Sequence, residues 1–177
     1  MTFLYVALAL AAVLVLAGLV MPSRYSIAHT ETIGATPVEV HAWVGHLDKW
    51  PQWMPWEQDD PSIITSIGDR TTGVGAAQSW TSKKAGDGEV EFTECDESMG
   101  IAYDMTFVTK TKRAPSKASI RYSPSGNATE VTWSMEGDFA DMLPPVMRGL
   151  MKPVICSMMS KNFTRGLSGL KAKVEGS

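Results

Sequence analysis

The chain has 177 residues and a formal net charge of −3 at neutral pH. None of its 16 basic and 19 acidic residues comes before Arg24, so an uncharged start precedes a remainder long enough for one domain with a core. The acidic balance and the lack of a basic stripe argue against nucleic acid as a partner.

The start of the chain is an apolar run from Phe3 to Met21. As a helix, its 19 residues would span roughly 28 Å, close to the ~30 Å hydrocarbon core of a bilayer. Pro22 and Ser23 then end the run. We therefore expect residues 1–22 to form a single-pass membrane anchor, followed by one domain over residues 23–177.

A cleaved signal peptide is the alternative, with Val15 and Ala17 as the small residues before the cut. The run lacks a basic start and is longer than a typical signal-peptide core, which favours a retained anchor. Arg24 is the only basic side chain nearby, so the positive-inside rule favours a cytoplasmic domain, whereas the free amine of Met1 opposes it.

The first elements of the domain are predicted from local signals. The weak alternation of Arg24–Ile33 indicates a strand. Thr36 then suits a helix N-cap, Pro37 suits the first helical position, and Glu39 can close a capping box. We expect this helix to continue to Val44.

Another helical turn is expected around Asp48–Trp53, and after Pro61 the apolar residues alternate with a period of two, as in strands with one buried face. Asp87 and Gly88 indicate a hairpin turn between two of these strands. The expected strands are Ser62–Ile67, Ala76–Thr81, Glu89–Cys95, Ile101–Phe107, Lys117–Tyr122 and Val131–Glu136.

The C-terminal part of the sequence has helical spacing. Pro144, Pro145 and Pro153 are expected to bound a short helix around Val146–Met151, before a long helix over Pro153–Val174. The apolar stripe of the long helix comprises Ile155, Met159, Phe163, Leu167, Leu170 and Val174. A sheet with one apolar face needs such a cover, so the sequence predicts an α+β fold in which a curved antiparallel sheet wraps around one long helix, a helix grip.

This order of elements resembles the START-like superfamily, also labelled SRPBCC or polyketide cyclase/dehydrase-like, including its membrane-anchored bacterial members. The resemblance covers nearly all of Arg24–Val174. It rests on five segments in the family's order: Ala35–Val40, Leu47–Trp56, Gly73–Gly75 ahead of Trp80, Thr129–Gly137 and Phe163–Lys171. The resemblance implies an internal apolar cavity between sheet and helix, but no single chemistry, because members include lipid carriers, hormone receptors and aromatase/cyclases.

Aromatic and methionine side chains are the candidate lining of this cavity. Four tryptophans fall between positions 43 and 56, and eight of the eleven methionines lie at or after Met99. Methionine adapts to irregular ligand shapes, although the same residues could be ordinary core or, for the tryptophans, contacts with the membrane interface. The expected lining residues are Trp43, Trp53, Trp56, Trp80, Phe92, Tyr103, Met105, Phe107, Tyr122, Trp133, Met135, Met151, Ile155 and Met159.

The sequence offers no catalytic or metal-binding constellation. His29, His41 and His46 have no second ligand at metal spacing. Cys95 and Cys156 are far apart and are expected as two buried thiols, since nothing in the sequence requires a disulfide. We therefore assign no catalytic residue, metal or cofactor.

The leading hypothesis from the sequence is a membrane-anchored, non-catalytic protein that binds a hydrophobic small molecule or lipid. One alternative is a cyclase- or hydrolase-type enzyme with Glu57, Asp59, His41 or Tyr103 as acid or base, which requires a titrating group that faces the cavity. The other is a stress-response or interaction scaffold, whose interior would be filled.

Overall fold

A computed structural model describes residues 22–84, 86–109 and 112–176, without the side chains at 146 and 150, together with positions 3, 5, 6, 9, 13, 15, 16, 18 and 20. Most of the expected anchor, Phe3–Met21, lies outside the described residues. Within the described part of the chain, no helix is both long and apolar enough to cross a membrane.

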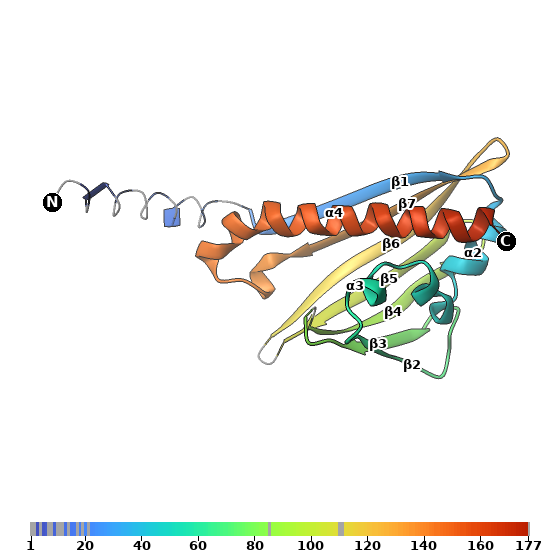
Figure 1. Cartoon of the computed structure of the whole chain (residues 1–177), viewed down its shortest axis with the longest axis horizontal. Coiled ribbons are helices and arrows are strands. Elements are labelled where there is room, and N and C mark those ends of the chain that lie inside the picture. The colour runs from blue at the N-terminus through green and yellow to red at the C-terminus, as the bar shows by residue number, and fades with distance from the viewer. Residues whose placement is uncertain are drawn as a thin grey trace.

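One antiparallel sheet of seven strands forms the body of the domain, in the spatial order β1-β7-β6-β5-β4-β3-β2 (Figure 1). The strands are β1 Arg24–Ile33, β2 Ile64–Ile67, β3 Ala77–Thr81, β4 Asp87–Asp96, β5 Gly100–Val108, β6 Arg113–Ser125 and β7 Ala128–Asp138. Each strand after β2 pairs with its sequence neighbour, and β1 closes the order by pairing with β7, so the first and last strands of the chain lie side by side.

The long helix α4, Pro145–Glu175, covers one face of this sheet and runs alongside β1 (Figure 1). The shorter helical elements are α2 Pro37–Val44, the 3-10 turn η1 Leu47–Gln52, α3 Trp56–Asp59 and the 3-10 turn η2 Phe139–Asp141. A curved antiparallel sheet against one long C-terminal helix is the predicted helix grip, so the α+β fold class is confirmed.

The start of α2 agrees with its sequence signal. The backbone N–H of Thr36 donates to the Glu39 carboxylate at 2.7 Å, and the N–H of Glu39 donates to the Thr36 hydroxyl at 3.4 Å. This reciprocal pair is the predicted capping box, which satisfies two backbone donors at the helix end.

α4 differs from the prediction at Pro153. The helix runs without a break from Pro145 to Glu175, so the separate helix expected around Val146–Met151 is wrong: those residues are the first turns of α4. A proline inside a helix removes one backbone hydrogen bond. The exposed position of Pro153 and the packing of α4 along β1 allow the helix to continue past it.

The hairpin between β3 and β4 also differs from the prediction. Asp87 and Gly88 begin β4, and the residue with positive φ in the preceding turn is Gly86, at +79°. A Cβ at position 88 would lie 2.2 Å from Cζ2 of Trp80, which faces Gly88 across the two strands. Gly88 is therefore explained by the space that the Trp80 ring needs and not by a turn.

Candidate functional site

The interior between the sheet and α4 has one half that is filled with aromatic rings. Trp133 on β7 stacks on Phe163 of α4, with ring centroids 4.2 Å apart and planes 5° from parallel. Trp53 and Trp56 each meet the Trp133 ring edge-on at 5.8 Å. The aromatic cluster consists of these four residues with Trp50, Phe92 and Tyr103. Each such pair contributes about 0.5–1.5 kcal/mol beyond its buried area, so the cluster closes this half firmly.

Tyr103 lies at the centre of the aromatic cluster. Its hydroxyl accepts a hydrogen bond of 2.9 Å from the indole N–H of Trp133. Burial raises the pKa of Tyr103, which keeps the hydroxyl protonated at neutral pH. The group considered above as an acid or base is therefore a bonded part of the core.

Two glycines let α4 approach the aromatic cluster. A Cβ at Gly166 would lie 2.7 Å from Cζ3 of Trp133, and a Cβ at Gly169 would lie 2.4 Å from the carbonyl oxygen of Trp53. Glycine costs about 1 kcal/mol relative to alanine inside a helix. Close packing against the two tryptophans explains both glycines.

The other half of the interior lies under the first half of α4 and is less tightly covered. In the apolar stripe of this helix, Ile155 and Met159 are only half-buried. The later members are buried: Phe163, Leu167, Leu170 and Val174. We call this less covered region the open half. Its helix side comprises Met151, Ile155, Cys156 and Met159.

Small side chains form part of the sheet side of the open half. β6 presents Ala114, Ser116 and Ala118 on its inner face here, whereas nearer the other end it presents Ile120 and Tyr122. Larger side chains from the neighbouring strands flank them: Met105 and Phe107 on β5 and Met135 on β7. The small side chains are covered in part by Tyr25, whose hydroxyl bonds to that of Ser116 at 2.8 Å and whose ring stacks on Phe139 at 4.5 Å.

Two buried polar atoms of the interior have no hydrogen-bond partner among the described residues. They are Nε1 of Trp53 and Oε1 of Gln78. Gln78 lies opposite Val90, on the same face of β3 as Trp80, and so points inward. An unpaired buried polar group costs about 1–3 kcal/mol, so each atom is suited to a water molecule or a ligand group.

The structure distributes the predicted lining residues over several places. Trp53, Trp56, Phe92, Tyr103 and Trp133 belong to the aromatic cluster. Met105 and Met135 are buried in the core, and Phe107, Ile155 and Met159 are partly buried against it. Met151 is half-buried on α4, and Trp80 meets Phe107 at 6.1 Å. Trp43 is half-buried with the Lys49 ammonium 5.3 Å from its ring, and Tyr122 bonds to His41.

The two carboxylates considered as catalytic groups serve to hold α3. Glu57 accepts a hydrogen bond of 2.9 Å from the Thr65 hydroxyl on β2. Asp59 accepts two hydrogen bonds from the Arg165 guanidinium, at 2.5 and 2.9 Å, which lower the pKa of Asp59. These bonds tie α3 to the sheet and to α4, and they give neither carboxylate a place in the open half.

One polar cluster was missed by reasoning from the sequence. His41 on α2 is buried between the Tyr122 hydroxyl, 3.2 Å from Nδ1, and the Cys95 sulfur, 3.5 Å from Nε2. Neither cysteine forms a disulfide. The residues are 54 and 81 positions apart in the chain, so no local spacing could reveal the contact.

Two open hollows formed by described residues lie outside the open half. One, of about 440 Å³, lies where His29 of β1 meets the outer side of α4, and the other, of about 520 Å³, lies over β2 to β5. Over the same described residues, no group of three or more His, Cys, Asp or Glu side chains could hold a metal ion. We take the open half as the candidate ligand site because the apolar stripe of α4 is only half-buried there.

The sequence from residue 24 to residue 175 matches the family described as polyketide cyclase / dehydrase and lipid transport. The chain belongs to this family. The match spans the domain from β1 to the end of α4, and it confirms the resemblance to the SRPBCC superfamily. Membership associates the domain with hydrophobic ligand or lipid binding.

Several solved structures share this fold. Norcoclaurine synthase from Thalictrum flavum is 14% identical, with a TM-score of 0.62 over 88% of this chain and 96% of that one. The protein CV1439 from Chromobacterium violaceum is 17% identical, with a TM-score of 0.59 over 85% and 96%. The hypothetical protein jhp0584 from Helicobacter pylori is 11% identical, with a TM-score of 0.64 over 85% and 88%. At these identities the likeness shows the fold alone, and no curated protein matches the sequence.

Proposed function

We propose that this member of the family is a membrane-anchored, non-catalytic protein that holds a hydrophobic small molecule or lipid in the open half. The observation that carries the proposal is the half-buried start of the α4 stripe, at Ile155 and Met159. An apolar ligand placed there would bury the exposed parts of Ile155 and Met159, at about 25 cal/mol per Å² of apolar surface. The lipid-transport members of the family support the same class of ligand.

Filling the open half tests the ligand proposal. The substitution Ala118→Phe adds a ring to the inner face of β6, and Lys117→Phe adds the same ring on the exposed outer face as a matched control. In mild detergent, we expect the full chain and K117F to bind a fluorescent apolar probe or co-purify with lipid by native mass spectrometry. We expect A118F to bind at least about tenfold more weakly, because the ring occupies the ligand volume. Thermal unfolding checks that A118F is folded, and equal binding by A118F and K117F would refute the proposal.

The membrane part of the proposal rests on the uncharged run and on how the domain holds the residues after it. The Lys152 ammonium on α4 donates to the carbonyl oxygens of Pro22 and Arg24, at 3.0 and 2.5 Å. The open half therefore lies on the part of α4 that is bonded to the residues just after the apolar run. Placed in a bilayer, the run would keep a ligand entrance close to lipid.

Cell fractionation tests the anchor. We expect the full chain to stay with membranes through an alkaline wash, and a variant with Val13→Arg and Leu14→Arg to be released. Each arginine at the centre of a span costs about 2.5–3.5 kcal/mol. Arg24 favours a cytoplasmic domain, which protease protection in sealed vesicles would check. Release of the unmodified chain by the wash would disprove the anchor and leave the ligand site untouched.

A further inference from the structure

His41 lies between a thiol and a phenol at the end of the sheet where α2 packs. Its Nε2 is 3.5 Å from the sulfur of Cys95, and its Nδ1 is 3.2 Å from the hydroxyl oxygen of Tyr122. His41 and Tyr122 are buried, whereas Cys95 is half-buried and so remains open to small reagents. The imidazole thus contacts the thiol through one ring nitrogen and is oriented by the phenol through the other.

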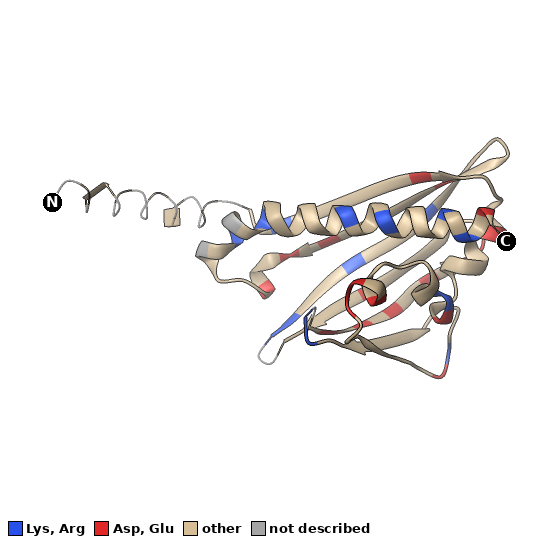
Figure 2. Cartoon of the chain, in the orientation of Figure 1, with Lys and Arg blue, Asp and Glu red and all other residues tan. Residues whose placement is uncertain are grey.

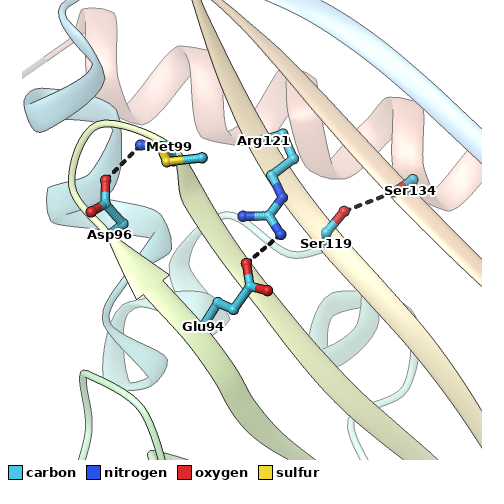
Figure 3. A network of polar contacts seen from close by, with 6 residues as sticks. All are labelled: Glu94, Asp96, Met99, Ser119, Arg121 and Ser134. Carbon is cyan, nitrogen blue, oxygen red and sulfur yellow. Dashed lines mark hydrogen bonds and ion pairs between the residues drawn. The ribbon is translucent and has the colours of Figure 1, made fainter.

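An irregularity in β4 turns Cys95 toward His41. The pairing of β4 with β5 shifts register between Phe92 and Glu94, which marks a β-bulge. With regular alternation, Glu94 would share the inner face with Phe92, and Cys95 would point outward. The bulge instead sends Glu94 to the Arg121 guanidinium at 2.5 Å, as Figure 3 shows, and turns Cys95 inward.

Gly45 makes room for the same contact. Its φ is −74°, a value that any residue adopts, so backbone conformation does not require glycine there. A Cβ at this position would lie 2.3 Å from Nε2 of His41, the atom that faces Cys95. The bulge in β4, the glycine after α2 and the hydroxyl from β6 thus build one contact from three separate parts of the chain.

The protonation states of His41 and Tyr122 set the direction of the hydrogen bonds around the sulfur. Burial lowers the pKa of His41, against the opposing effects of Glu97 and Asp96, so the ring is neutral at neutral pH. Burial raises the pKa of Tyr122, so its hydroxyl keeps the proton and can donate it to Nδ1. A neutral imidazole that accepts at Nδ1 carries its own proton on Nε2, which faces the sulfur and can donate a hydrogen bond to it.

We propose that Cys95 is a modification site, a reactive thiol that exchanges with low-molecular-weight disulfides and is held for attack by His41 and Tyr122. Cys95 releases its proton to solvent, and the thiolate attacks one sulfur of the disulfide. A bond forms between the two sulfurs as the original S–S bond breaks, and the other half leaves as a thiolate. Cys95 is oxidised and the leaving half is reduced, so no further oxidant is needed. The proposal is independent of ligand binding in the open half.

Cys156 on α4 provides an internal reference, because it is also half-buried and burial raises its pKa. The purified full chain is incubated with oxidised glutathione in mild detergent, and the adduct on each cysteine is followed by peptide mass spectrometry. We expect Cys95 to react about tenfold faster than Cys156. We expect His41→Phe to reduce the Cys95 rate to that of Cys156 and to leave Cys156 unchanged.

Tyr122→Phe separates activation from simple exposure. It removes one hydroxyl, and we expect the pH–rate profile of Cys95 to move to higher pH while the circular dichroism spectrum stays that of the unmodified chain. If His41→Phe does not fold, the Tyr122→Phe profile alone decides the question. Equal exchange rates at the two cysteines would overturn the proposal. So would fast exchange at Cys95 that neither substitution changes.

Discussion

His41 is held in its neutral form between α2 and the sheet. Burial lowers its pKa below the ordinary value of about 6.5, so the unfolded chain takes up a proton at a pH where the folded chain does not. The stability associated with the neutral ring is therefore present above about pH 6.5 and is lost as the pH falls through the lowered pKa. Cys95 and Tyr122 contact the ring, and Glu97, Asp96 and His46 act on its charge.

His41→Gln should flatten this pH dependence, because glutamine fills similar space and does not titrate. We expect the free energy of unfolding of the natural chain to fall more steeply between pH 7 and pH 5 than that of H41Q. Urea unfolding at several pH values measures both curves. His29→Gln, at a half-buried site on β1, is the control and should keep the natural slope. Parallel curves for H41Q and the natural chain would contradict the assignment of this pH dependence to His41.

At the scale of the elements, α4 contains glycine inside a helix, where glycine has a low intrinsic propensity. Gly166 weakens the helix, yet it lies where the Trp133 ring needs the space of a side chain. Gly166→Ala would gain about 1 kcal/mol of helix propensity and would force a methyl group against a ring that the aromatic cluster holds in place.

We expect the steric cost of the methyl group to exceed the gain in helix propensity, because Trp133 packs against Trp53, Trp56 and Phe163 and cannot move away. G166A should lower the free energy of unfolding by about 1–3 kcal/mol. Ser168→Ala, on the exposed side of the same helix, should stay within about 0.5 kcal/mol. Chemical denaturation of both variants makes the comparison, and a G166A protein as stable as S168A would show that the ring moves.

The elements that the sequence predicted well are those with local causes. The bounds of β1 and the capping box of α2 depend on neighbouring residues alone, and both are confirmed. Gly88 is explained by the Trp80 ring that faces it, and the bulge before Glu94 by the register of two strands. Neither cause can be found in a short stretch of sequence. The alternation of β6 likewise shows which side chains face inward, but it cannot show whether α4 covers them fully.

At the scale of the whole molecule, the two halves of α4 are held to different degrees. The second half joins the aromatic cluster, and Arg165 and Lys171 bond to Asp59 and Glu31 on its two sides. Such exposed ion pairs contribute at most about 1 kcal/mol each, so the aromatic packing is the larger difference. The basic side chains of the first half bond mainly to backbone carbonyl oxygens, and Figure 2 shows the charges spread along the helix.

Unequal packing predicts unequal local stability along this one helix. Hydrogen exchange measured by mass spectrometry on the full chain should show the amides of residues 154–160 exchanging at least about tenfold faster than those of residues 163–174, because fewer buried apolar contacts oppose local opening. A bound apolar ligand should then protect the first segment and leave the second unchanged, and A118F should lose that ligand effect while keeping the difference between segments. Uniform exchange along α4 would mean that the helix is held equally throughout, and ligand protection confined to residues 163–174 would move the binding site away from the open half.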